Sequence, residues 1–265
     1  MNASVIGRNF IKQMVASNTT VYRVIKMQRS LLLFLALLSA CADQGPSGFS
    51  SAQPGVNVAR AALAAGSPEM TLTVVNGILE REPRNLAALV AQGDALSVLG
   101  RSDEAGISYA KALALNPGFP GAEMGMARLQ LRTDPAQAQL LFLDVLQQEP
   151  RNAAALNNLG IAYDLQGNHS AAQGAYRQAL AADPSMRAAE VNLALSLALS
   201  GEAATAVRML TPMAMDANAS QRLRHDLAAA LAMAGDKAAA ARLLNGDLTQ
   251  DQIERALLAY GSLRR

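Results

Sequence analysis

Apolar side chains recur with helical spacing through most of the chain. In the stretch "ALNNLGIAY", Leu156, Leu159, Gly160 and Tyr163 follow the spacing i, i+3, i+4, i+7. This spacing places all four on one face of a helix. The pattern predicts an amphipathic helix that buries this face against a neighbour.

A second helix is predicted directly after the first. Ala172, Tyr176 and Ala179 form another apolar stripe, and "QGN" separates the two stripes. The glycine of this break tolerates a left-handed backbone, which is common where a helix ends. The second helix is expected to end at Asp183, because a residue before proline avoids the helical region. The unit is therefore a helical hairpin.

The hairpin repeats every 34 residues. Turn glycines are separated by 34, 67, 34 and 34 residues, and prolines by 34, 33 and 34. One missing residue between Pro120 and Asn152 accounts for the shorter gaps. The markers are Gly66, Gly100, Gly167, Gly201 and Gly235, with Pro83, Pro117, Pro150 and Pro184.

The repeat unit resembles the tetratricopeptide repeat, a 34-residue helix–turn–helix. The best copy is 153–186, with Leu156, Leu159, Gly160, Tyr163, Ala172, Tyr176, Ala179 and Pro184 at the marker positions. The resemblance implies an all-α fold, a right-handed superhelix of stacked hairpins. The expected repeats are 52–85, 86–119, 120–152, 153–186, 187–220 and 221–246, which place the array at about 56–246.

A capping helix is predicted after the array, within 247–265. Thr249 and Gln252 have the spacing of a capping box, and Ile253, Leu257 and Tyr260 follow as an apolar stripe. A stack of repeats needs such a terminal cover for its last interface.

Small residues occupy one position of the first helix in each repeat. Gly160 and Gly93 share it, and alanine fills it elsewhere. Glycine costs about 1 kcal/mol against alanine inside a helix. We therefore expect two helices to approach closely there, so that a side chain would push them apart. Tyr163 and Tyr176 lie on the apolar stripes and are interpreted as core residues rather than ligands.

The excess positive charge of the chain lies at the N-terminus. The formal charge is +2, but five basic residues and no acidic residue precede Cys41. The rest of the chain carries 18 basic and 21 acidic residues, so nothing there suggests a nucleic-acid binder, which would need a basic face. Cys41 is the only cysteine, so no disulfide can form within the chain.

Residues 27–40 have the order of a secretory signal peptide: Arg29, an apolar run from Leu31 to Leu38, then small residues. A buried helix of a soluble protein is the weaker alternative. "LSAC" resembles the lipobox of bacterial lipoproteins, which implies acylation of Cys41. Ala42 after the cysteine implies, by the family pattern, anchorage on the periplasmic face of the outer membrane. Residues 1–26 are expected to precede the true start at Met27, and 41–55 to form a lipidated, flexible tether.

Enzyme signatures are missing from the sequence. It contains no G-x-S-x-G, Walker loop, H-E-x-x-H or G-x-G-x-x-G motif. Its two histidines, His169 and His225, fall on different repeats. We expect no catalytic residue, cofactor, metal, small-molecule substrate or nucleic acid; a carboxylate-only active site is the open alternative.

The remaining candidate is a protein-binding groove. In tetratricopeptide proteins the first helix of each repeat lines the groove, and asparagine amides can hold the backbone of an extended peptide. The alternative is that asparagine is simply common at this repeat position. Apolar members of the set also suit an amphipathic helix or an extended apolar segment. The candidate groove residues are Asp94, Met124, Arg128, Asn157, Asn158, Ile161, Asp164, Val191, Asn192, Leu195, Arg222 and His225.

Residues His225–Leu263 lead from the last repeat through an Asp-Leu turn into a short closing helix near Tyr260. This resembles the tetratricopeptide lipoprotein (TadD type) of the tight-adherence (Tad/Flp) pilus machinery. The resemblance implies a non-catalytic assembly factor, with a secretin or another pilus or secretion component as partner. Two alternatives are an adaptor that regulates a periplasmic protease or cell-wall enzyme, and a generic cytosolic scaffold.

Overall fold

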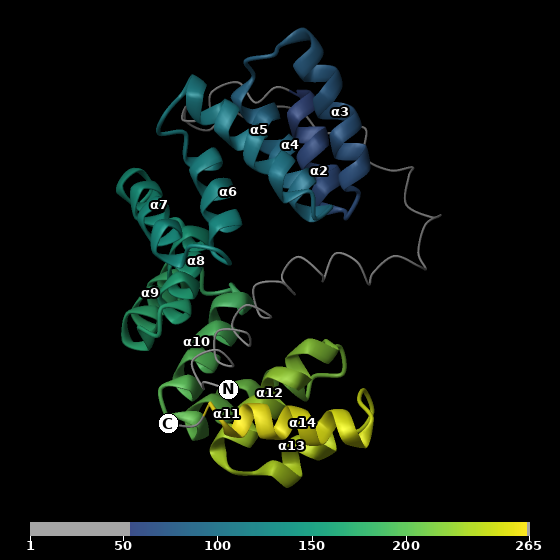
Figure 1. Ribbon diagram of the computed structural model, residues 1–265, viewed down its shortest axis with the longest axis vertical. Coiled ribbons are helices and arrows are strands. Elements are labelled where there is room, and N and C mark those ends of the chain that lie inside the picture. Colours follow the sequence, from purple (N-terminus) through teal and green to yellow (C-terminus); the bar gives the residue numbers. More distant parts are fainter. Residues whose placement is uncertain (1–53, 264–265) are drawn as a thin grey trace, which may run out of the picture. The chain divides into compact units, whose positions relative to one another are not determined.

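The computed structural model describes residues 54–263, which form thirteen α-helices and no strand (Figure 1). The predicted all-α class is therefore confirmed for this part of the chain. The predicted extension, signal peptide, acylated Cys41 and nearly all of the tether lie outside the described residues. Within residues 54–263 no helix is both long and apolar enough to cross a membrane.

The helices come in consecutive pairs, and each pair lies within one predicted repeat. The bounds are α2 (Pro54–Ala64), α3 (Pro68–Arg81), α4 (Leu86–Val98), α5 (Ser102–Leu115), α6 (Pro120–Gln130), α7 (Pro135–Gln148), α8 (Ala153–Leu165), α9 (His169–Ala182), α10 (Arg187–Leu199), α11 (Ala203–Ala214), α12 (Gln221–Ala234) and α13 (Lys237–Leu244). The last helix, α14 (Gln250–Gly261), follows the array.

Local sequence signals set the helix ends. Asn85 and Asn152 cap α4 and α8 by accepting the backbone N–H three residues on, as expected for N-cap residues. Gly167 and Gly235 adopt φ values of +80° and +99° in the turns between paired helices, a region that glycine enters at little cost. The expected capping box of α14 is present, with Thr249 and Gln252 bonded reciprocally.

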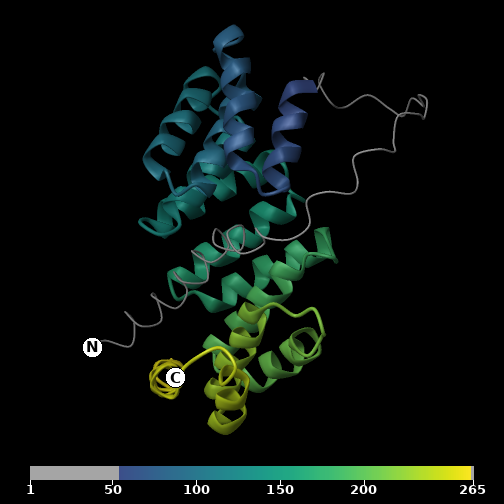
Figure 2. The ribbon, with the colours of Figure 1, turned by 90° about the vertical axis from the view of Figure 1, so that its right-hand side faces the viewer.

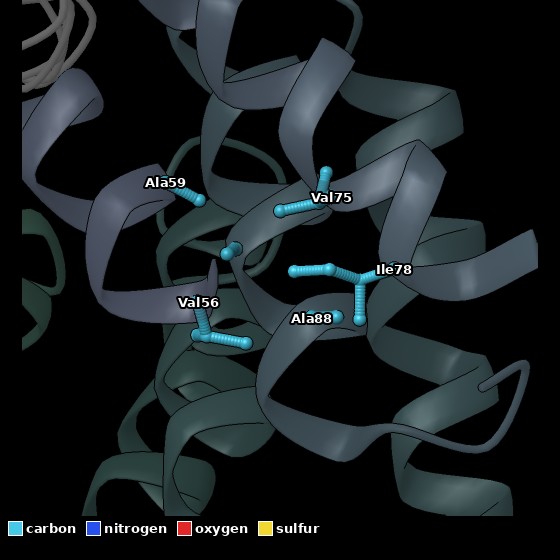
Figure 3. Packing of buried hydrophobic residues seen from close by; sticks show 6 residues of the cluster. Val56, Ala59, Val75, Ile78 and Ala88 are labelled. Carbon is cyan, nitrogen blue, oxygen red and sulfur yellow. The ribbon is translucent and has the colours of Figure 1, made fainter. Parts of the chain in front are cut away.

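The described residues divide into two compact units, and the division falls after Gly125, inside α6. The N-terminal unit contains α2 to α5 and the first part of α6; in it each of α2, α3 and α4 packs against the next helix. Its core lies where α2, α3 and α4 meet, and Figure 3 shows Val56, Ala59, Val75, Ile78 and Ala88 converging there. Burial of these apolar side chains stabilises the hairpin.

The C-terminal unit runs from Met126 to the end of the described chain. Consecutive helices from α7 to α13 pack against one another, and the first helices α8, α10 and α12 also pack in order (Figure 2). α14 packs on α12, as a first helix of a further repeat would. The interface around α14 buries Ile253 with Ala228, Ala240 and Leu244, so α14 covers the end of the stack as expected.

Candidate functional site

The candidate groove residues divide into interior and accessible side chains. We call the stacked first helices α8, α10 and α12 the first-helix face of the C-terminal unit. Leu195, Ile161 and Asp164 are buried, as is Met124 in the N-terminal unit. Side chains that are half-buried or exposed are Asp94, Arg128, Asn158, Val191, Arg222 and His225. All of these residues lie on the first helices of their repeats, but packing between repeats takes some of them into the interior.

Asn157 and Asn192 meet across two repeats. The Asn192 Nδ2 donates to Asn157 Oδ1 at 2.9 Å, and both side chains are buried. This bond links α8 to α10, and it leaves each amide with further donor or acceptor capacity. Asn158, one position along α8, is more accessible. Asn157 and Asn192 therefore join two repeats, and Asn158 is the most accessible of the three candidate asparagines.

Asp164 is the most connected polar group of the first-helix face. Its Oδ2 accepts from the Tyr176 hydroxyl at 2.9 Å, and its Oδ1 accepts from Ser196 Oγ at 2.8 Å. His169 Nδ1 lies 2.8 Å from the same Oδ1. Three elements, α8, α9 and α10, are thereby tied to one carboxylate, so Asp164 joins repeats rather than facing a ligand.

Burial governs the protonation of this cluster. Desolvation raises the pKa of the Asp164 carboxyl above its usual value, while hydrogen bonds from His169, Ser196 and Tyr176 lower it. Desolvation and the neighbouring carboxylate raise the pKa of Tyr176 well above its usual value. Tyr176 is a fully buried core residue, as predicted, and Tyr163 is half-buried.

The glycines in the first helices fit against tyrosine rings. A Cβ on Gly160 would stand 2.6 Å from Tyr176 Cδ1, and one on Gly93 would stand 2.5 Å from Tyr109 Cε1. The expected close approach is confirmed, and the neighbour is the tyrosine of the second helix. Gly125 also lies against the Tyr109 ring, with a built Cβ 2.6 Å from Cδ1. Tyr109 donates to Asp94 Oδ1 at 2.7 Å.

Charged side chains gather where α12 meets the α13–α14 turn. Arg222 Nε lies 3.8 Å from Asp226 Oδ2, and His225 Nε2 lies 3.1 Å from Asp247 Oδ2. Arg224 Nη2 also lies 3.8 Å from Asp247 Oδ2. The sequence analysis named Arg222 and His225 but neither aspartate. Asp226 could have been recognised from its i, i+4 spacing to Arg222.

The described residues contain no cluster of side chains that could bind a metal ion. Residues 54–263 contain no group of three His, Cys, Asp or Glu side chains placed to hold a metal ion. Among the candidate residues, the accessible polar groups of the first-helix face are the Asn158 amide, the Arg222 guanidinium group and the His225 imidazole. These groups suit hydrogen bonding and ion pairing with a polypeptide.

Comparison with known families identifies the repeat. Tetratricopeptide repeat models match residues 57–120 and residues 153–186. A curated relative, the tetratricopeptide repeat and J domain-containing co-chaperone DNJ1 of Fusarium oxysporum f. sp. lycopersici, is 31% identical over 109 residues. That match covers 40% of this chain and 21% of the relative, so the chain spans about a fifth of the relative's length.

Solved structures show the same architecture. PilW, described as a widely conserved type IV pilus biogenesis factor, superposes with a TM-score of 0.66 at 18% identity. The match covers 77% of this chain and 96% of PilW. Pseudomonas aeruginosa PilF gives a TM-score of 0.60 at 16% identity, over 78% of this chain and 93% of PilF. The fold is therefore that of an all-α tetratricopeptide-repeat protein, as expected from the repeat.

Proposed function

We propose that this chain, which has the all-α tetratricopeptide-repeat fold, is a non-catalytic lipoprotein that binds a partner polypeptide on its first-helix face. The tetratricopeptide fold is typically a scaffold for protein–protein binding. The observation that carries the proposal is the stacked set α8, α10 and α12, which presents Asn158, Val191 and His225 on consecutive repeats. Consecutive repeats offer a partner a row of similar contacts.

Hydrogen bonds between repeats hold the helices of the first-helix face in place, so the face can bind a partner without rearranging. The Asp164 cluster and the Asn157–Asn192 bond fix α8 against α10. Fixed side chains lose less conformational freedom when a ligand binds. A partner therefore meets a prearranged row in which apolar and amide groups lie side by side.

The biological setting we propose is assembly of a Tad/Flp-type pilus or its secretin channel at the outer membrane. The lipobox at Cys41 and the predicted tether that precedes α2 support a chain held at the membrane by acyl groups. The fold shared with PilW agrees with a pilus setting. The C-terminal resemblance to the Tad lipoprotein supports the choice among pilus systems.

The face is tested by two arginine substitutions. Asn158→Arg with Val191→Arg places bulk and charge on α8 and α10 without touching the Asp164 cluster. Gln178→Arg with Ala204→Arg adds the same charge to exposed positions of α9 and α11. Each version is expressed in its native host, crosslinked in membranes and recovered, and its partners are identified by mass spectrometry.

We expect the face variant to lose a specific partner by about tenfold, because hot-spot contacts dominate interface energy, while the control keeps it. Unchanged partner recovery by the face variant, with unchanged helix content, would refute binding at this face. A pilus or secretin component as the lost partner supports the Tad setting. A periplasmic protease or cell-wall hydrolase would instead support the adaptor role. Incorporation of labelled palmitate that disappears in Cys41→Ser tests the lipid anchor.

A further inference from the structure

Two asparagines of the chain are followed directly by glycine, Asn76 and Asn245. In such a pair the backbone nitrogen of the glycine can attack the side-chain amide carbon of the asparagine. Glycine has no side chain to block this approach, and its backbone is the most permissive of all residues. The two pairs lie in different surroundings, so they are expected to react at different rates.

The first pair lies inside a helix. Asn76 and Gly77 belong to α3, so the Gly77 N–H is part of the hydrogen-bond ladder of that helix. The Asn76 side chain is held as well, because its Oδ1 accepts from Gln92 Nε2 at 2.8 Å. Asn76 is exposed, yet attack on it requires a turn of α3 to open and the bond to α4 to break.

The second pair lies where α13 ends. Asn245 is the C-cap residue of α13, and both Asn245 and Gly246 are exposed. Within residues 54–263 neither the Asn245 side chain nor the Gly246 N–H has a hydrogen-bond partner. A Cβ built on Gly246 would meet nothing within 4 Å. Both reacting groups are therefore free and accessible.

The reaction needs one backbone rotation at Asn245. Its φ of −62° and ψ of −22° are helical, whereas closing a five-membered ring requires a ψ outside the helical region. The rotation breaks the bonds that the N–H groups of Asp247 and Leu248 donate to the Leu244 carbonyl, at 3.0 Å each. A terminal turn of this kind opens more readily than a helix interior.

We propose that Asn245 is a site of spontaneous deamidation and that its products loosen the α14 cap. The Gly246 nitrogen bonds to Asn245 Cγ and gives up its proton, and the side-chain nitrogen leaves with that proton as ammonia. Water then adds to either carbonyl of the succinimide ring, and the ring C–N bond at that carbonyl breaks. The products are aspartate and isoaspartate, in which the backbone runs through Cγ. The modification does not depend on which polypeptide the first-helix face binds.

Both products are unfavourable at this position. A new carboxylate stands at the C-terminal end of α13, where the last carbonyl groups already carry partial negative charge. It also lies two residues from Asp247, whose Oδ2 is 3.1 Å from His225 Nε2. Isoaspartate in addition lengthens the backbone by one carbon just before α14. Since α14 covers Ala240 and Leu244 at the end of the stack, we expect the cap to open more often.

Mass spectrometry of the full chain tests the site. The purified chain is kept at physiological temperature in mildly alkaline buffer, and conversion of amide to acid is followed in the peptides that contain residues 76 and 245. Isoaspartate is counted by enzymatic methylation of its carboxyl group. We expect conversion at Asn245 to be about a hundredfold faster than at Asn76, because the helix holds the Asn76 groups out of attack geometry.

Gly246→Ala is the matched variant for the chemistry. A side chain at position 246 hinders the approach of the nitrogen, so conversion at Asn245 should slow by at least about tenfold. Equal rates at Asn76 and Asn245, or unchanged conversion in Gly246→Ala, would overturn the proposed site.

Asn245→Asp reproduces one product and tests its effect on the cap. We expect amide hydrogen exchange in α14 to become about two- to fivefold faster, the factor that a charge at an unfavourable helix end produces. Asn116→Asp is the control, because Asn116 is the exposed C-cap residue of α5 in the other compact unit. Unchanged exchange in α14 of Asn245→Asp, or equal acceleration in Asn116→Asp, would refute the loosening of the cap.

Discussion

Replacing Gly160 with alanine perturbs a close approach between α8 and the Tyr176 ring of α9. The new Cβ would stand 2.6 Å from Cδ1 and 2.7 Å from Cζ of Tyr176. The ring cannot simply move aside, because Tyr176 is fully buried and its hydroxyl is bonded to Asp164 at 2.9 Å. Either α8 and α9 must separate or the Asp164 bond must break.

The size of the effect follows from two opposing terms. Adding a methyl to a tightly packed site costs about 1–3 kcal/mol. Alanine gains about 1 kcal/mol of helix propensity over glycine. The propensity term can be measured separately at Gly174 in α9, where a built Cβ meets nothing within 4 Å. Gly174→Ala is therefore expected to stabilise the chain by up to about 1 kcal/mol.

The assay is urea unfolding followed by circular dichroism for both variants. The difference between their free energies of unfolding isolates the steric term, and we expect about 1–3 kcal/mol, with Gly160→Ala the less stable. Adding Tyr176→Leu should bring the effect of Gly160→Ala close to that of Gly174→Ala, because the clashing ring is gone and only the propensity gain remains; a double-mutant cycle measures this coupling. Equal effects of Gly160→Ala and Gly174→Ala would refute the packing explanation of the glycine.

Three further predictions test the polar contacts. Tyr176→Phe should lower the free energy of unfolding by about 1–2 kcal/mol, since Asp164 loses one of three donors; unchanged stability in urea unfolding would contradict this role. Thr249→Ala should cost about 1 kcal/mol and speed amide hydrogen exchange in α14; unchanged exchange there would contradict the capping role. Asp226→Asn should stabilise the chain above pH 7 by roughly 3 kcal/mol at most. Burial raises the pKa of the folded carboxyl to about 6 from its ordinary 3.8, so the contribution of Asp226 to stability is greatest below pH 3.8 and falls as pH rises through about 6. A stability difference between the wild type and Asp226→Asn that stays constant across that range, in urea unfolding at several pH values, would contradict the burial of Asp226.

The helical hairpins could be predicted because each signal was local. The 34-residue spacing of turn glycines is matched by the left-handed φ of Gly66, Gly100, Gly167, Gly201 and Gly235. The capping box at Thr249 needs only residues three apart. Such features depend on neighbours in sequence, so they survive whatever the repeats pack against.

The roles of the polar residues could not be predicted in the same way. Asp164 has the periodic phase of a groove residue, yet Ser196 from the next repeat and Tyr176 from the next helix enclose it. Helical phase gives the direction of a side chain but not the depth at which a neighbouring repeat covers it. The pairing of Asn157 with Asn192 was missed for the same reason. Gly125 was also missed: it faces the ring of Tyr109 as Gly93 does, but it lies on α6, the first helix of the next repeat.

Photocrosslinking at position 158 tests the binding of a polypeptide to the first-helix face most directly. A photoreactive phenylalanine analogue replaces Asn158 on α8 or, as the control, the exposed Arg177 on α9. After irradiation of intact cells, we expect a covalent adduct to one partner polypeptide from position 158 and none from position 177. Adducts of equal yield from both positions, or from position 177 alone, would contradict binding on the first-helix face.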